Sequence, residues 1–273
     1  MSSLVPKHIQ RLAPYIPGTP IDQIRREYGI EHPVKLASNE SAIGASPRVA
    51  ETVQKLLADI HRYPDPRAHD LRAAVAAHWG ITPGELAFGN GSNELIDLVC
   101  RVFAGGDDHV VFGDPSFLCY RIACVAGAVP FTDVPLTGGL SWDIPAMLAA
   151  VTPRTRILFL SNPNNPTGAY VGGEALRRLL TALPREVVPV LDEAYAEFVA
   201  DGAQCLRRRF REDAFRRSIA RHARAGRRWA RSRRRVGARQ VVRALAAASE
   251  AAAASSPAVA ASSRSERRLL AAE

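Results

Sequence analysis

The sequence predicts an α/β fold of three layers, with helices on both faces of a mostly parallel sheet. Two short apolar runs, at residues 157–160 and 187–191, have the length and composition of buried strands. Apolar residues at helical spacing over 172–183 lie between them, and a strand–helix–strand unit of this kind is a right-handed crossover between parallel strands. Because open α/β sheets bind ligands at the carboxyl ends of their strands, the polar residues that follow both runs are expected to line one crevice.

Three of those polar residues suit pyridoxal 5'-phosphate. A carboxylate at Asp192 can pair with a protonated ring nitrogen, while Tyr195 and Asn165 can reach the ring hydroxyl. The cofactor needs such contacts because its pyridinium must stay protonated to act as an electron sink. The bond between Asn165 and Pro166 is expected to be cis. Taken alone, the run D-E-A-Y is equally typical of a capped helix start.

The run N-P-N-N-P-T-G followed by D-E-A-Y resembles the fold-type I aminotransferases, and K-L-A-S-N-E with R-Y-P-D-P is most similar to the histidinol-phosphate aminotransferases. This resemblance implies pyridoxal phosphate as cofactor and a cytoplasmic homodimer that acts on a small-molecule amino donor and a 2-oxo acid. The substrates would be histidinol phosphate and 2-oxoglutarate, in histidine biosynthesis. Aromatic-amino-acid transaminases and amino-acid-phosphate decarboxylases share these motifs and remain alternatives.

Taken in order, the chain is expected to begin with an N-terminal arm over 1–33, which contains an amphipathic helix at 21–28. A partial aminotransferase large domain, which binds the cofactor, follows over 34–203, and a basic tail over 204–273 ends the chain. Short apolar runs bounded by turn residues predict further strands, and apolar residues at helical spacing predict further helices. The strands are expected at 34–37, 86–89, 109–112 and 128–134, and the helices at 47–59, 67–79, 95–103, 116–126 and 144–151.

The resemblance also implies roles for residues outside the central unit. Gly91, Ser92 and Asn93 lie in a loop just before the helix expected at 95–103, at a helix N-terminus where backbone N–H groups and the dipole attract an anion, and the resemblance makes them the cofactor phosphate site. The ring of Phe117 would stack on the pyridine. An ordinary capped helix and a core phenylalanine are the alternatives.

Three residues are expected to act at subunit or substrate contacts, again by resemblance. Tyr63 would reach the cofactor phosphate of the partner subunit, with a surface tyrosine ahead of a turn as the alternative. Tyr15 and Asn39 are the candidate substrate contacts, although Tyr15 is equally suited to packing the arm down.

Composition excludes several classes of protein. A hydrophobic content of 47% over 273 residues fits a soluble globular chain of one large or two ordinary domains. No apolar run reaches the roughly 18 residues of a membrane span, and the N-terminus lacks the apolar core of a signal peptide. The four cysteines and seven histidines show no metal-ligand spacing, so neither a membrane nor a metal is expected.

Charge divides the chain abruptly. Residues 1–205 carry 17 basic and 22 acidic side chains, a net charge of −5, whereas residues 206–273 carry 19 arginines, no lysine and 5 acids, a net charge of +14. We interpret the tail from about residue 204 as a frameshifted translation, disordered or irregularly helical, because out-of-frame reading of GC-rich DNA yields arginine and alanine. The alternative is a genuine basic tail that binds polyanions electrostatically. No nucleic-acid module is recognisable, so no specific nucleic-acid partner is expected.

Lysine usage decides the expected chemistry. Transamination needs an amine that forms a Schiff base and moves the substrate proton, and arginine cannot replace it. The chain has only Lys7, Lys35 and Lys55, all ahead of the cofactor motifs, and it lacks the Ser-Lys and Leu-x-Gly-x-Arg runs that the resemblance implies. No catalytic residue is therefore assigned, and the chain is expected to be truncated, inactive and prone to aggregation through an unpaired sheet edge. A pseudo-enzyme that keeps the cofactor without a covalent bond is a further alternative.

Overall fold

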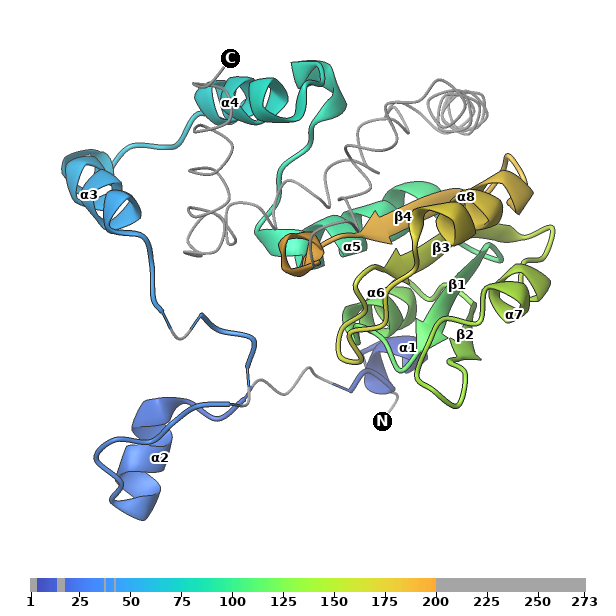
Figure 1. The fold of residues 1–273 in the computed structure, drawn as a ribbon, viewed down its shortest axis with the longest axis horizontal. Coiled ribbons are helices and arrows are strands. Elements are labelled where there is room, and N and C mark those ends of the chain that lie inside the picture. The colour runs from blue at the N-terminus through green and yellow to red at the C-terminus, as the bar shows by residue number, and fades with distance from the viewer. Residues whose placement is uncertain (1–3, 14–17, 37, 42, 200–273) are drawn as a thin grey trace, which may run out of the picture. The chain divides into compact units, whose positions relative to one another are not determined.

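A computed structural model describes residues 4–13, 18–36, 38–41 and 43–199 of the chain (Figure 1). Tyr15 and the basic tail lie outside these residues. The described residues divide into two compact units. The first contains the residues up to Leu12 and those from Arg62 onward, and the second contains the residues between them.

The first unit is built around a four-stranded sheet in which every neighbouring pair of strands is parallel. Its strands are β1 (His109–Asp114), β2 (Phe131–Pro135), β3 (Thr155–Ser161) and β4 (Val188–Asp192), in the order β2-β1-β3-β4. The predicted strand–helix–strand unit is therefore confirmed: β3 and β4 pair directly, and the helix between them is α8 (Gly173–Ala182).

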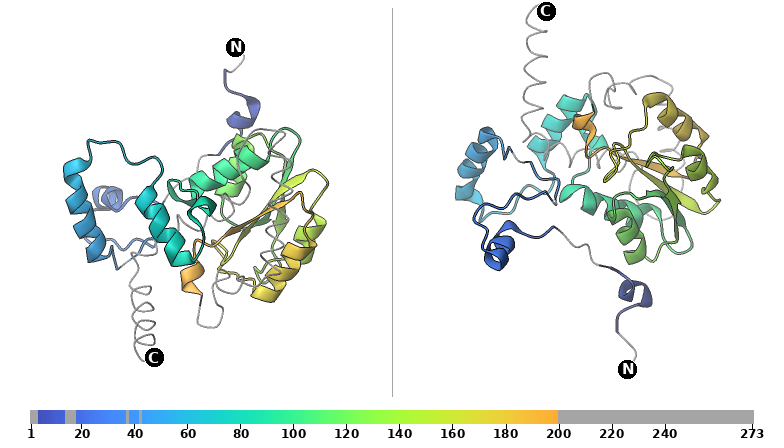
Figure 2. Two further views of the ribbon diagram at one scale, coloured as in Figure 1. Left: turned by 90° about the horizontal axis from the view of Figure 1, so that it is seen from above. Right: turned by 60° about the horizontal axis from the view of Figure 1, so that its bottom comes forward.

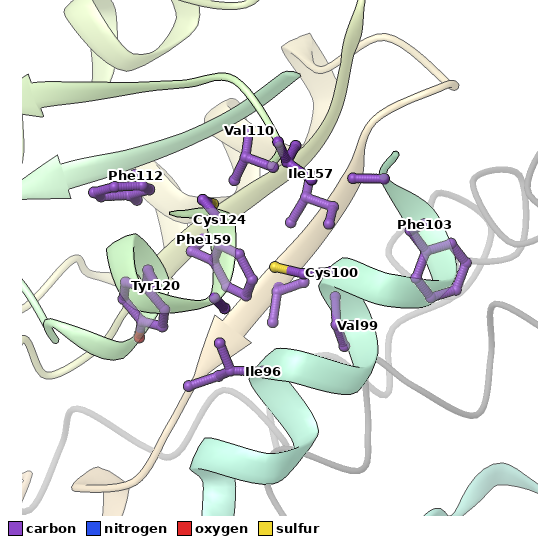
Figure 3. Packing of buried hydrophobic residues seen from close by; sticks show 14 of the residues in the cluster. Ile96, Val99, Cys100, Phe103, Val110, Phe112, Tyr120, Cys124, Ile157 and Phe159 are labelled. Carbon is purple, nitrogen blue, oxygen red and sulfur yellow. The ribbon is translucent and has the colours of Figure 1, made fainter. Parts of the chain in front are cut away.

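Helices cover both faces of this sheet, as the sequence predicts (Figures 1 and 2). On one face α5 (Gly91–Phe103) and α6 (Cys119–Ala126) share an apolar cluster with Ile157 and Phe159 of β3 (Figure 3). On the other face α7 (Ile144–Ala149) and α8 share a cluster with the alternate residues Leu158 and Leu160. Successive side chains of a strand point to opposite faces, so β3 needs a continuous apolar run because both of its faces are buried.

The described chain contains further helices, which differ in length. They are α1 (Lys7–Gln10), α2 (Ile21–Tyr28), α3 (Pro47–Leu56), α4 (His69–Trp79) and the 3₁₀ turns η1 (Leu57–Asp59), η2 (Pro83–Glu85) and η3 (Ala196–Phe198). Helix α2 has the predicted bounds, and α3 begins at a proline, whose fixed φ and missing N–H suit the first turn. Neither α2 nor α3 contains a buried residue. No helix in the described part of the chain is long and apolar enough to cross a membrane.

Two predicted strands are wrong. Residues 86–89 form no strand: Leu86 is buried beside Ala76 of α4, and its carbonyl oxygen accepts a hydrogen bond of 2.6 Å from Arg72 instead of a ladder bond. The described residues of 34–37 form no strand either, and the Val34 side chain is 82% exposed. A short apolar run satisfies the strand pattern in both places, but the backbone has no adjacent strand to pair with in the described chain.

One close contact inside the first unit depends on a glycine. The ring of Trp142 packs against the backbone of β1 at Gly113, where an added Cβ would lie 2.2 Å from a ring carbon of the tryptophan. Trp142 is buried and belongs to the cluster beneath α7 and α8. Any side chain at position 113 must therefore displace the ring from this cluster.

We expect Gly113→Ala to lower the free energy of unfolding by roughly 1–3 kcal/mol, the usual cost of overpacking a core. Urea unfolding measures the change. Gly138→Ala is the matched control, because no atom lies within 4 Å of the position of its added Cβ. Equal unfolding free energies for the two variants would contradict this account of the contact.

Candidate active site

The polar residues after β3 and β4 meet at one edge of the sheet. Ser161 and Asp192, the last residues of these strands, are paired in register. Beyond them the backbone N–H of Asn162 donates to the carbonyl oxygen of Asp192 at 2.8 Å. The carboxyl ends of the two strands therefore lie side by side, which is where parallel sheets of this kind bind ligands.

Asp192 presents a buried carboxylate at this edge. The residue is 2% exposed, its Oδ2 accepts a hydrogen bond of 2.7 Å from the hydroxyl of Tyr120, and its Oδ1 accepts one of 3.2 Å from the N–H of Ala194. Burial raises the pKa of Asp192, and the two hydrogen bonds act in the opposite direction. None of the ion pairs within the described residues includes Asp192. A buried carboxylate without a cation suits a cationic ligand group such as a protonated pyridine nitrogen.

Tyr120 is a site residue that sequence reasoning missed. It lies on α6, is fully buried, and its ring stacks on that of Phe159 at 4.6 Å between centroids. Burial, followed by the charge of Asp192, raises the pKa of the Tyr120 phenol well above its usual 10.0. The sequence signal for it is a tyrosine within an apolar helical run. A buried tyrosine hydroxyl usually finds a hydrogen-bond partner, so this pattern indicates a polar group nearby.

A second missed residue, Asn164, joins the loops that follow β1 and β3. Its side chain is 3% exposed; Oδ1 accepts from the Ser116 hydroxyl at 2.8 Å, while Nδ2 donates to the carbonyl of Pro115 at 3.0 Å and to Thr167 Oγ1 at 2.9 Å. Both loops are held by this one amide, because three of its hydrogen-bonding positions are satisfied within the protein.

Asn165 and Tyr195 lie on the loops at this edge, and both are half-buried. The backbone N–H of Asn165 donates to the Ser161 hydroxyl at 3.4 Å. The ring of Tyr195 lies 6.3 Å from that of Phe198. The predicted cis bond between Asn165 and Pro166 is confirmed.

Phe117 contacts Tyr120, whose hydroxyl donates to the Asp192 carboxylate. It is half-buried and packs against the cluster under α5 and α6. Its ring meets that of Tyr120 edge-on, at 5.9 Å and an angle of 88°. The structure therefore gathers Phe117 and Asp192 around one buried tyrosine.

The loop predicted to bind phosphate forms the beginning of α5, four residues earlier than the helix expected from the sequence. Gly91 has φ +76°, in the left-handed region that favours glycine, and no atom lies within 4 Å of the place of an added Cβ. Ser92 is half-buried and Asn93 is exposed. The Glu94 carboxylate accepts from the backbone and side-chain amides of Asn90, so an acidic group already occupies part of this helix start.

Two of the three remaining predicted residues lie within the described chain. The Tyr63 side chain is fully exposed in the first unit, and Asn39 is an exposed residue of the second unit. Tyr15 lies outside the described residues. No group of three or more potential metal ligands occurs among the residues that the structure describes.

The buried carboxylate should make stability depend on pH. Burial raises the pKa of Asp192 above its ordinary 3.8, so the folded chain binds this proton more tightly than the unfolded chain does. The resulting stabilisation is present below pH 3.8 and is lost as pH rises through the raised pKa. Asparagine does not titrate. The free energy of unfolding of Asp192→Asn should therefore increase relative to that of the wild-type chain between about pH 4 and about pH 8.

Urea unfolding at both pH values measures this difference. Asp107→Asn, at an exposed position, is the control for the loss of one acidic side chain. A pH-independent difference for Asp192→Asn would mean that its carboxyl has an ordinary pKa in the folded chain.

The chain is similar to known proteins over most of its length. The family model "Aminotransferase class I and II" matches residues 31–223. A histidinol-phosphate aminotransferase of Anaeromyxobacter sp. (strain Fw109-5) is 41% identical over 211 residues, which are 76% of this chain and 58% of that protein. One from Halalkalibacterium halodurans is 45% identical over 188 residues, 69% of this chain and 51% of that protein. The chain thus spans little more than half the length of these relatives.

Solved structures of aminotransferases also align with this chain. A histidinol-phosphate aminotransferase from Sinorhizobium meliloti, solved in complex with pyridoxal-5'-phosphate, aligns with a TM-score of 0.69 at 25% identity, over 92% of this chain and 71% of that one. An N-succinyldiaminopimelate aminotransferase from Mycobacterium tuberculosis aligns with a TM-score of 0.55 at 27% identity, over 62% of this chain and 47% of that one.

Proposed function

We propose a cofactor-binding function for this chain, which belongs to the aminotransferase class I and II family. Residues 34–203 would form the part of such an enzyme that binds pyridoxal phosphate. The observation that carries the proposal is the buried Asp192 carboxylate at the end of β4, which has a raised pKa and no ion pair within the described chain. Pyridoxal phosphate, when bound, supplies an electron sink for bond cleavage at the substrate's amino carbon.

Each proposed contact has a local support. Asp192 would hold the ring nitrogen, and Asn165 and Tyr195 the ring hydroxyl, since all three lie at the shared strand edge. Phe117 would cover one face of the cofactor ring. The phenylalanine ring itself is oriented by its edge-on contact with Tyr120. The phosphate would meet the start of α5 at Gly91, Ser92 and Asn93, since the first backbone N–H groups of a helix attract an anion.

The proposed reaction is transfer of an amino group between histidinol phosphate and 2-oxoglutarate, in the histidine biosynthesis of the cytoplasm. It is supported by the names of relatives that are 41% and 45% identical. A different amino donor is the second candidate, because a structure of an N-succinyldiaminopimelate aminotransferase aligns at a comparable identity of 27%. The intact enzyme would be a homodimer in which Tyr63, exposed here, reaches the partner's cofactor phosphate.

This chain by itself would not transaminate. Lys7 and Lys55 lie on α1 and α3, and Lys35 forms an ion pair of 2.7 Å with Glu40; all three precede every cofactor contact proposed above. We also propose that the sequence beyond about residue 203 is read out of frame, although the family match continues to residue 223. Reading the encoding DNA in all three frames tests this: another frame should spell Ser-Lys followed by Leu-x-Gly-x-Arg, and its absence would make the basic tail genuine.

The cofactor proposal is tested on the purified 273-residue chain. Equilibrium dialysis should show saturable binding of pyridoxal phosphate, and Asp192→Asn should weaken it about tenfold or more, because a charged hydrogen-bond partner is lost. Treatment of the mixture with sodium borohydride should attach no more cofactor to the wild-type chain than to Asp192→Asn, since the proposed binding at Asp192 includes no Schiff base and exposed amines react equally in both.

Asp107→Asn is the matched control for dialysis, as a change of the same chemistry at an exposed position. A pyridoxyl adduct at one of the three lysines that is lost in Asp192→Asn would contradict the proposed lack of covalent attachment. Equal binding by the wild-type chain and Asp192→Asn would remove Asp192 from the cofactor site.

A further inference from the structure

We propose that Tyr120 is the positioning residue for Asp192: its buried hydroxyl keeps the carboxylate ionised and fixes its orientation toward a ligand cation. This inference rests on the proposed cofactor function for the identity of the ligand. The effect on the carboxylate itself does not depend on it, because it concerns two side chains of the protein.

The geometry joins two elements that are distant in sequence. The Tyr120 hydroxyl on α6 donates to Asp192 Oδ2 at 2.7 Å across a separation of 72 residues. The N–H of Ala194 donates to Oδ1 at 3.2 Å. With a donor on each oxygen, the plane of the carboxylate is set by the protein before any ligand binds.

The tyrosine ring has little freedom to move its hydroxyl elsewhere. Its residue is fully buried, one face stacks on Phe159 at an interplanar angle of 10°, and Phe117 meets it edge-on. Side chains in a close-packed core stay in their rotamers. The hydroxyl is therefore held at the carboxylate by apolar packing on the rest of the ring.

The electrostatics give this hydrogen bond a function. Burial raises the pKa of Asp192, whereas donation from Tyr120 is the first factor that lowers it. Two other titratable groups near it in the described chain are the Cys119 thiol of α6, whose pKa is raised by burial and then by Asp192, and the Glu193 carboxyl next in sequence. Neither of these is a cation, so the charged carboxylate is favoured by the phenol of Tyr120 first and by the N–H of Ala194 second.

A purely structural hydrogen bond makes a different prediction. If Tyr120 only fills space, its phenylalanine variant keeps the ring stack and leaves the carboxyl pKa unchanged. If it acts through Asp192, removal of one oxygen atom leaves a buried carboxylate with one donor fewer, and its pKa rises.

The experiment compares the full-length wild-type chain with Tyr120→Phe. Titration of the Asp192 side-chain carbonyl carbon by NMR, with ¹³C-labelled aspartate and Asp192→Asn to assign the signal, should show a pKa higher by about one unit or more in the variant. Binding of pyridoxal phosphate should weaken in Tyr120→Phe, with a larger fold-change at pH 6 than at pH 8, because less of the carboxyl is ionised at the lower pH. In the Asp192→Asn background the same change should have no effect on binding.

Tyr28→Phe is the matched control, since Tyr28 is a largely exposed tyrosine at the end of α2, and it should leave the carboxyl pKa unchanged. If Tyr120→Phe fails to fold, the double variant with Asp192→Asn should fold again, because the buried charge is gone; failure of that rescue would overturn the proposal. An unchanged carboxyl pKa in folded Tyr120→Phe would also overturn it. A raised carboxyl pKa in a chain whose wild type binds no pyridoxal phosphate would support the link between the two side chains and refute the proposed function alone.

Discussion

Strand β3 is the constraint on which the rest of the first unit depends, because it pairs with β1 on one side and β4 on the other. Its alternate side chains are fully buried in two separate clusters, Ile157 and Phe159 on one face and Leu158 and Leu160 on the other. A shift of one residue would exchange the two sets between the faces. The packing that prevents this shift also aligns Ser161 with Asp192, so the core sets the position of the candidate site.

The site is stabilised by the same elements that form the core. Burial of a polar group is costly unless it is paired, and both missed residues meet this requirement within the protein. Tyr120 stacks in the apolar cluster and donates its hydroxyl to the Asp192 carboxylate. Asn164 satisfies three of its hydrogen-bonding positions between two loops. The carboxylate, by contrast, keeps a raised pKa and no ion pair in the described chain, and a ligand cation can supply that charge.

The sequence predicted the four strands of the central sheet and, wrongly, two others. Both outcomes have the same physical reason, because a strand needs a neighbouring strand to pair with. Parallel strands buried on both faces are continuous apolar runs, and such a run at β3 and β4 is also flanked by polar loop residues that mark its end. The run at 86–89 is also apolar, but its buried leucine packs on α4 while Arg72 binds the backbone carbonyl. Whether an apolar run becomes a strand depends on a neighbouring strand, which is information from elsewhere in the chain.

By itself the sequence determined the order of helices and strands from α5 to β4, the parallel crossover and the edge at which Asp192, Asn165 and Tyr195 lie, because apolar periodicity and strand-end residues are local properties. Only the tertiary structure decided which buried groups meet there. Tyr120 lies 72 residues before its carboxylate partner, and the loop containing Asn164 reaches Pro115 across 49 residues. Hydrogen bonds of this kind depend on how the helices and loops pack onto the sheet, and that packing has no periodic signature in the chain.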